Sequence, residues 1–231
     1  MITQQKTKLF RIVTAVVFLL LSLGVIYNAK QSYDFYLEFA GQVTPATEAD
    51  VKLAILSAVL TSLHIVVYLS MAVLLLVTQK PRLYLIPAAA FVLWYVYCLG
   101  LKVYSIVSIF DTMQKHRGLM YSQIAGFIAA MALVLVAIAV LIYVICCVTG
   151  RKMQAANVIL MASLALAVVL ILVSLRFTID SEKLGTRYSQ NIYVGHLTLT
   201  VKALAMFPVA CAVRLSQSEG RAEEFVEVDV V

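Results

Sequence analysis

The sequence predicts an all-α membrane protein, a polytopic bundle of about six transmembrane helices with both termini on the cytoplasmic side. Of its 231 residues, 63% are hydrophobic and only 13% are charged, about half the charged fraction of a typical soluble domain. Such a chain is neither a soluble globular protein nor a disordered one, because it has ample apolar surface to bury. The lipid bilayer is therefore its first expected partner.

Six apolar stretches, separated by charged or turn-forming residues, predict the membrane-spanning helices. They cover residues 12–27, 53–78, 83–110, 124–148, 157–175 and 192–213, and about 20 apolar residues suffice for one crossing. The first stretch follows basic residues as a signal peptide does. It lacks a small-x-small cleavage pattern at 27–30, so we interpret it as an uncleaved helix.

Two segments outside these stretches have a different composition. Residues 28–50 place aromatic side chains around Asp34 and Glu38, which predicts an outer interfacial loop with a short helix lying at the membrane interface, or a segment that packs as a cap on the bundle. Residues 214–231 hold five acidic residues and predict a disordered cytoplasmic tail. The expected organisation is a six-helix membrane domain over residues 1–213, followed by this tail.

The distribution of Lys and Arg predicts the orientation. Nine basic residues flank the helix ends on the N-terminal side of the membrane, and seven flank the opposite ends. Two connections on the N-terminal side, at 80–82 and 151–152, are short and purely basic. Because cytoplasmic loops are enriched in Lys and Arg, this pattern places both termini in the cytoplasm. It also explains the excess of 18 Lys and Arg over 12 Asp and Glu without a nucleic-acid partner.

Polar residues recur at helical spacing in the second, third and sixth stretches, where lipid-facing positions should be apolar. One stripe is Ser57, Thr61, His64 and Tyr68; another is Trp94, Cys98, Lys102 and Ser105; the last is Gly195, Thr198 and Lys202, with His196 beside it. Residues three or four apart share a helix face. The stripes predict a polar, cationic cavity between these three helices, open to the outer face. The candidate ligand-binding residues are Lys202, His64, Lys102, Thr61, Tyr68, Thr198, His196 and Trp94.

Lys202 is the most informative of these residues. A lysine at a helix centre costs about 2.5 to 3.5 kcal/mol on insertion scales, and no acidic residue lies inside an apolar stretch to pair with it. Three functional interpretations of Lys202 follow. It is neutral, it binds an anionic small molecule or lipid headgroup, or it pairs with an acidic residue of another subunit. The structural alternative is a lysine solvated by hydroxyl groups and backbone carbonyls, or one whose side chain snorkels toward the interface.

Two functional classes fit these patterns. We find no catalytic motif, so an enzyme is not expected, and the three histidines lack the spacing of a metal or haem site. No cofactor is expected. The polar stripes favour a small transporter, or the substrate-binding membrane subunit of one. The alternative is a non-catalytic accessory or scaffold subunit, whose partner is another membrane protein or a second copy of the chain.

Overall fold

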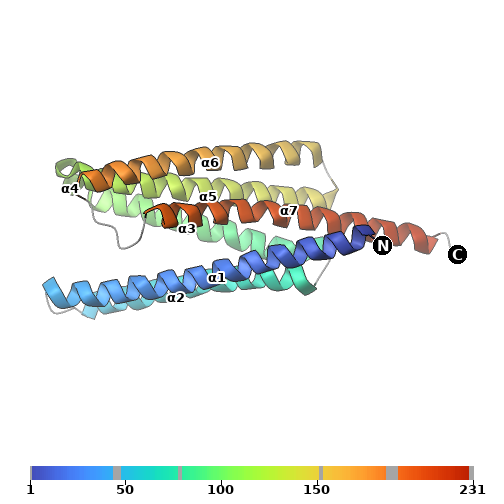
Figure 1. The fold of residues 1–231 in the computed structure, drawn as a ribbon, viewed down its shortest axis with the longest axis horizontal. Coiled ribbons are helices and arrows are strands. Elements are labelled where there is room, and N and C mark those ends of the chain that lie inside the picture. Colours follow the sequence, from blue (N-terminus) through green and yellow to red (C-terminus); the bar gives the residue numbers. More distant parts are fainter. Residues whose placement is uncertain (1, 44–47, 78–79, 151–152, 186–191, 229–231) are drawn as a thin grey trace.

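The computed structural model describes the backbone of residues 2–43, 48–77, 80–150, 153–185 and 192–228. Side chains are described at residues 8–27, 30, 59, 63–77, 80–150, 153–185, 192–193 and 196–215. The elements are α1 (Ile2–Val43), α2 (Glu48–Val77), the 3-10 turn η1 (Pro81–Tyr84), α3 (Leu85–Ser108), α4 (Phe110–Lys115), α5 (Arg117–Thr149), α6 (Met153–Lys183) and α7 (Ile192–Val228). The described chain holds no strand, which confirms the predicted all-α bundle (Figure 1).

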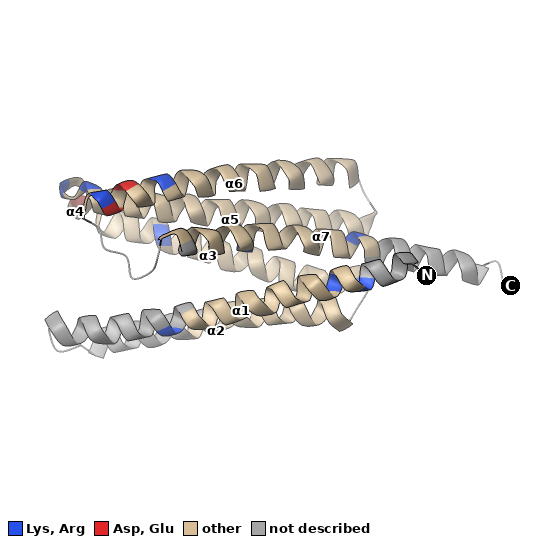
Figure 2. Ribbon diagram, in the orientation of Figure 1, with Lys and Arg blue, Asp and Glu red and all other residues tan. Residues whose placement is uncertain are grey.

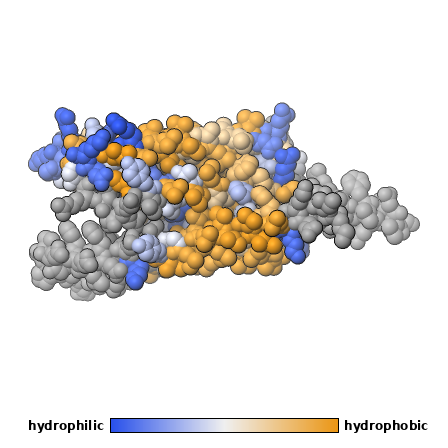
Figure 3. Space-filling model, in the orientation of Figure 1, coloured by the Kyte–Doolittle hydropathy of each residue, from blue (hydrophilic) through white to orange (hydrophobic). Residues whose placement is uncertain are grey.

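Five described segments are long and apolar enough to cross a membrane, and they lie in α1, α3 with η1, α5, α6 and α7. The described apolar part of α2 is the shorter segment Leu63–Val77. Figure 3 shows the result on the surface as a hydrophobic belt between two polar ends. By length and composition, this is an integral, multi-pass membrane protein.

Most helices extend beyond the predicted stretches, and α1 and α7 do so furthest. Helix α1 continues to Val43, through most of the predicted outer loop 28–50, because residues 28–40 contain no proline or glycine that would stop it. Helix α7 continues to Val228, through most of the predicted disordered tail 214–231, where Ala and Glu are good helix formers. The apolar pattern marks where a helix is in lipid, and the helix itself can continue into water.

A tight turn joins α5 to α6. Gly150 ends α5 in the left-handed conformation, with φ 68°, and its N–H donates to the carbonyl of Cys146. A glycine is suited to this position because it has no Cβ to clash there. The turn lets α6 return antiparallel along α5, against which it packs for most of its length (Figure 1).

In the described structure, five helices close into a ring. Going round it, α5 contacts α7, α7 contacts α1, α1 contacts α2, α2 contacts α3, and α3 contacts α5 again. Helix α6 lies outside this ring, against α5 and α7 (Figure 1). Helices α1, α3 and α6 run in one direction and α2, α5 and α7 run back. The ring therefore has an interior that all five helices face.

The two ends of the bundle differ in charge (Figure 2). The end that we call the basic end carries the described residues Lys8, Arg11, Lys80, Arg82 and Arg214. The opposite end, which contains α4, carries all the acidic residues whose side chains the structure describes, Asp111, Asp180 and Glu182, mixed with basic ones. The start of α1 and the end of α7 lie at the basic end (Figure 1). By the positive-inside rule, the basic end is predicted to face the cytoplasm.

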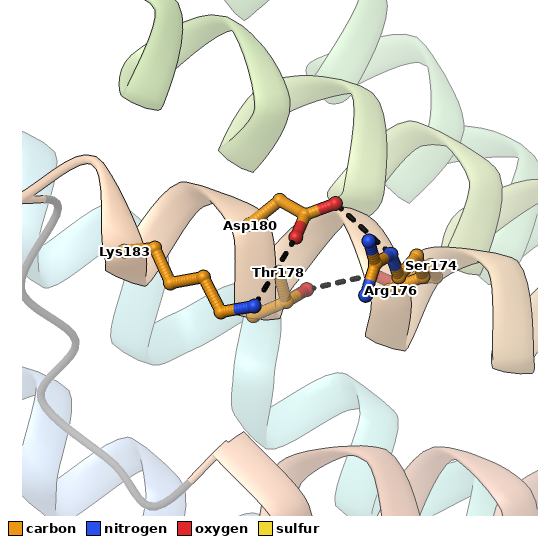
Figure 4. Close-up of polar contacts among 5 residues, drawn as sticks. All are labelled: Ser174, Arg176, Thr178, Asp180 and Lys183. Atoms are coloured by element: carbon orange, nitrogen blue, oxygen red, sulfur yellow. Dashed lines mark hydrogen bonds and ion pairs between the residues drawn. The ribbon is translucent and has the colours of Figure 1, made fainter.

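Small residues and hydroxyl groups join α6 to α5. Ser174 donates to the carbonyl of Ala125 at 2.8 Å, and Ser181 donates to the carbonyl of Gly118 at 2.6 Å. Buried alanines on both helices let the backbones approach this closely. Figure 4 shows the last turns of α6, where the carboxylate of Asp180 pairs with Arg176 and Lys183 and the Thr178 hydroxyl donates to the carbonyl of Ser174.

Replacing Ser181 by alanine is expected to lower the free energy of unfolding by about 0.6 kcal/mol, the typical value for a hydrogen bond between membrane helices. Unfolding in mixed detergent and SDS micelles measures this change. Ser108→Ala is the control, because the exposed hydroxyl of Ser108 bonds only to Tyr104 of its own helix. Equal stability of the two variants would show that the Ser181 hydroxyl does not hold α6 to α5.

Candidate ligand-binding site

An aromatic layer closes the interior of the ring about halfway along the spans. It consists of Phe18 from α1, Tyr68 from α2, and Phe91 and Tyr95 from α3, each at most 3% exposed. Their ring centroids lie 5.2 to 6.1 Å apart, within the usual range for packed aromatic pairs. The first three long helices thus meet through large side chains at one level of the membrane.

Apolar side chains fill the ring between the aromatic layer and the basic end. The largest of them are almost completely buried: Met71, Leu75, Tyr84, Met206, Val209 and Val213. They come from α2, η1 and α7 and belong to the same hydrophobic cluster as the aromatic layer. On this side, the interior of the described ring is a packed core.

Polar side chains lie on the other side of the layer, toward the α4 end. The helix directions place His64 one turn beyond Tyr68, and Cys98 and Lys102 one and two turns beyond Tyr95. Along α3, exposure rises from the buried Tyr95 to the half-buried Cys98 and the exposed Lys102. We call this α4-side region, with His64, Trp94, Cys98, Lys102 and Lys202, the vestibule.

His64 is the most deeply buried polar residue of the vestibule, at 6% exposure. Its imidazole stacks on the Trp94 indole, with centroids 4.9 Å apart and an angle of 27° between the planes. It also lies 4.4 Å from the ring of Tyr68. Its Nε2 atom is buried and has no hydrogen-bond partner among the described residues. A buried polar atom left without a partner costs about 1 to 3 kcal/mol.

The two tyrosines of the aromatic layer form a hydrogen bond that uses the hydroxyl hydrogen of only one of them. The hydroxyl oxygens of Tyr68 and Tyr95 are 2.9 Å apart, and either can be the donor. The accepting hydroxyl keeps its own hydrogen, and no other hydrogen bond of either group is seen in the described part of the chain. A donor is thus free beside His64, whose ring lies 5.9 Å from the ring of Tyr95.

Lys202 brings a charge to the same region from α7. It is half-buried and lies within electrostatic range of both His64 and Cys98. The ion pairs of the described residues join Arg176 and Lys183 to Asp180. Lys202 therefore has no carboxylate partner in the described structure.

Lys102 lies along the surface of α5, in the space that Gly126 leaves. A Cβ atom at position 126 would be 3.3 Å from Cε and 3.4 Å from Nζ of Lys102. The Lys102 ammonium is also within electrostatic range of Cys98. The end of this lysine side chain thus lies against a glycine of a neighbouring helix.

The structure brings His64, Tyr68, Trp94, Lys102 and Lys202 into one region. It does not bring His196 there. The imidazole of His196 faces α6, with Nε2 3.1 Å from the Ser174 hydroxyl and 3.5 Å from that of Thr178. The physical reason is rotation: six residues separate His196 from Lys202, which puts their side chains about 120° apart around the helix.

The other candidates are less informative. Thr198 precedes Lys202 by one helical turn and is half-buried. The side chain of Thr61 lies outside the described residues. Phe18 was not predicted, and its sequence context contains no signal for it, because its role in the aromatic layer depends on α1 closing the ring. Tyr95 adjoins the Trp94 stripe, so its four-residue spacing from Phe91 was an available signal.

No family model, curated protein or solved structure matches this chain. Function is therefore inferred from the geometry of the vestibule. In and beside the vestibule, the described groups without an ion-pair or hydrogen-bond partner include the Lys202 and Lys102 ammonium groups, Nε2 of His64 and one tyrosine hydroxyl hydrogen, and all of them can donate. A ligand that only accepts hydrogen bonds, as an ionised carboxylate does, complements such a set.

Proposed function

We propose that this membrane protein binds a small organic anion in the vestibule and carries it across the bilayer, as a transporter or as the substrate-binding membrane subunit of one. The observation that carries the proposal is that Lys202 lies within electrostatic range of His64, whose buried Nε2 atom has no hydrogen-bond partner in the described chain. Lys202 has no carboxylate partner there either. An ionisable residue inside a membrane bundle is by default a candidate functional site, and substrate pathways are one of its known roles.

The chemistry of such a ligand follows from the groups around it. One anionic oxygen accepts from the Lys202 ammonium and from His64 as its Nε2–H tautomer. The free hydroxyl hydrogen of the tyrosine pair can reach a second oxygen from the aromatic layer. Charge-assisted hydrogen bonds of this kind are about twice as strong as neutral ones. Binding therefore satisfies groups whose burial is otherwise costly.

The ring supports transport rather than binding alone. Among the described residues, its interior is packed toward the basic end, and along α3 exposure rises toward the α4 end, as expected for one end state of alternating access. The Tyr68–Tyr95 hydrogen bond connects α2 to α3 where the two halves of the path meet.

The sole tryptophan of the chain, Trp94, provides the test, because its indole stacks on His64. We expect a saturable change in its fluorescence when the protein in nanodiscs is titrated with acetate, butyrate, succinate or phosphate at constant ionic strength. Lys115→Leu, which removes an exposed lysine at the α4 end, should leave the response unchanged. No response to any of these anions would contradict the proposal. Uptake of the strongest binder into proteoliposomes then tests transport.

One observation favours the accessory-subunit alternative. An open groove of about 450 Å³ runs between α6 and α7 on the outside of the ring. Its lining is Met161, Leu164, Ala165, Val168, Leu204, Phe207 and Pro208, an apolar surface that suits a partner's transmembrane helix. Under this alternative, native mass spectrometry of gently purified protein should show a stoichiometric second membrane protein. Lys202→Leu, or deletion of residues 221–231, should release it.

A further inference from the structure

We propose that His196 is a proton-binding site, and that the proton bound there ties the start of α7 to α6. This site lies outside the vestibule, so the inference goes beyond the proposed anion-binding function. It depends on the hydrogen bonds that join His196, Ser174 and Thr178 to one another and to three backbone carbonyls.

Both ring nitrogens of His196 face oxygen atoms. Nδ1 lies 3.0 Å from the carbonyl oxygen of Ile192, one turn earlier on α7. Nε2 lies 3.1 Å from the Ser174 hydroxyl and 3.5 Å from the Thr178 hydroxyl, both on α6. A carbonyl oxygen can only accept a hydrogen bond, so the contact with Ile192 requires a hydrogen on Nδ1.

The two hydroxyl groups use their own hydrogens for other bonds. Ser174 donates at 2.8 Å to the carbonyl of Ala125 on α5, and Thr178 donates at 2.9 Å to the carbonyl of Ser174 (Figure 4). Each hydroxyl therefore presents an oxygen lone pair to Nε2 of His196. The Nε2 contact then requires a hydrogen on Nε2 as well, and an imidazole with hydrogens on both nitrogens is the protonated cation.

The neutral cluster contains one hydrogen too few. Each of its three side chains brings one polar hydrogen. Four close contacts need one: Nδ1 with Ile192, Nε2 with Ser174, and the two hydroxyl–carbonyl bonds. In the neutral state one of these contacts therefore sets two lone pairs against each other. A proton on His196 supplies the fourth hydrogen and completes the set.

The site joins three helices and can exchange protons with water. Ser174 and Thr178 are 1% and 5% exposed, whereas His196 is half-buried and begins the described apolar span of α7 at the α4 end. A proton can reach the ring from the solution at that end. The bonds that the proton completes are buried, where a hydrogen bond left unmade is costly.

Other charged groups surround the cluster. Among the described side chains of the neighbouring helices, they and the titratable tyrosines are Lys30, Lys102, Arg117, Tyr121, Arg176, Asp180, Glu182, Lys183, Tyr193 and Lys202. Asp180 pairs with Arg176 and Lys183. Glu182 follows Thr178 by four residues, so it shares the face of α6 that carries the hydroxyl groups. Its carboxylate would also favour a cation, and the experiment has to separate the two effects.

The experiment measures the unfolding of the full chain in mixed detergent and SDS micelles between about pH 5 and pH 8, the range in which histidine changes its charge. The folded bundle gains a hydrogen bond with the proton, and a state that binds more protons is favoured at low pH. Relative to His196→Gln, the unaltered protein should therefore be more stable at the lower pH. We expect the ratio of folded to unfolded protein to fall about fivefold across the range, the contribution of one hydrogen bond.

Matched variants separate the hydroxyl groups from the nearby charge. Ser174→Ala combined with Thr178→Val removes both hydroxyl groups and should abolish the advantage of low pH, as His196→Gln does. Glu182→Gln and His116→Gln are the controls, because both residues are exposed at the α4 end. Each control should keep the pH dependence of the unaltered protein.

A spectroscopic measurement covers the case in which the variants of the cluster fail to fold. Nitrogen-15 spectra of histidine-labelled protein distinguish the cation from either neutral tautomer. In His116→Gln at about pH 5, one cationic histidine should remain. A spectrum without a cationic histidine would overturn the inference.

Two results of the unfolding experiment would also overturn it. The same pH dependence in the unaltered protein and in His196→Gln would show that a proton on His196 does not stabilise the bundle. Loss of the pH dependence in Glu182→Gln would assign the effect to that carboxylate. None of these outcomes involves the anion response of Trp94, so the proposed function stands or fails separately.

Discussion

Replacing Lys202 by leucine is expected to abolish the anion response of Trp94 and, in the same protein, to stabilise the bundle. Insertion scales put a central lysine at about +2.5 to +3.5 kcal/mol and a leucine at about −0.3 to −0.6 kcal/mol. The exchange therefore favours the membrane-inserted α7 by about 3 to 4 kcal/mol. Because Lys202 has no described carboxylate partner, no ion pair is lost to offset this gain.

Two measurements on the same preparation check this prediction. Fluorescence titration with succinate reports binding, and the midpoint of unfolding in mixed detergent and SDS micelles reports stability. Lys115→Leu serves as the control for both, because Lys115 is exposed in α4, outside the ring. A more stable Lys202→Leu variant that still responds to anions would place the ligand elsewhere. A less stable variant would show that Lys202 makes a structural contact.

Replacing Phe91 by alanine is expected to produce the largest loss of stability. Phe91 is 1% exposed and contacts Phe18, Tyr68 and Tyr95, so its removal leaves a hole in the middle of the aromatic layer. Truncating a buried phenylalanine costs about 3 to 5 kcal/mol. We expect a value near the lower end, because lipid chains are as apolar as the protein interior and the loss is mainly one of packing.

The same variant tests the aromatic layer as the barrier between the two ends of the ring. If the layer closes the path, Phe91→Ala should let small anions leak from loaded proteoliposomes faster than the unaltered protein does. Phe110→Ala provides the comparison, because Phe110 is 53% exposed and its loss should change neither stability nor leak. Unchanged leak in a folded Phe91→Ala variant would move the barrier to the packed core nearer the basic end.

Much of the fold could be predicted from the sequence because membrane spans are read from length and apolarity. The predicted stretches 83–110 and 124–148 match α3 and α5 within a few residues at most ends. The prediction falls short at the polar continuations of α1 and α7, which run to Val43 and Val228. Hydropathy locates the part of a helix that lies in lipid and carries no information on whether the helix continues into water.

The candidate site shows a similar division. Spacing of three or four residues identified His64, Tyr68, Trp94 and Lys202, because such residues share a face whatever the fold. His196 did not join them, since its side chain faces Ser174 and Thr178 of α6. Which neighbour each face of α7 meets is a property of the assembled bundle.

The sequence by itself determined the class of this protein, its spans and the polar faces of three helices, because these depend on composition and on the geometry of a single helix. Only the tertiary structure decided that α1 closes a ring with α2, α3, α5 and α7 while α6 lies outside it, that Phe18 joins the aromatic layer, and that Lys102 lies against Gly126. The physical reason is that lipid and protein interior are equally apolar. Hydrophobic patterning therefore does not tell an inward face from a lipid-facing one, and packing between helices distant in the sequence makes that choice.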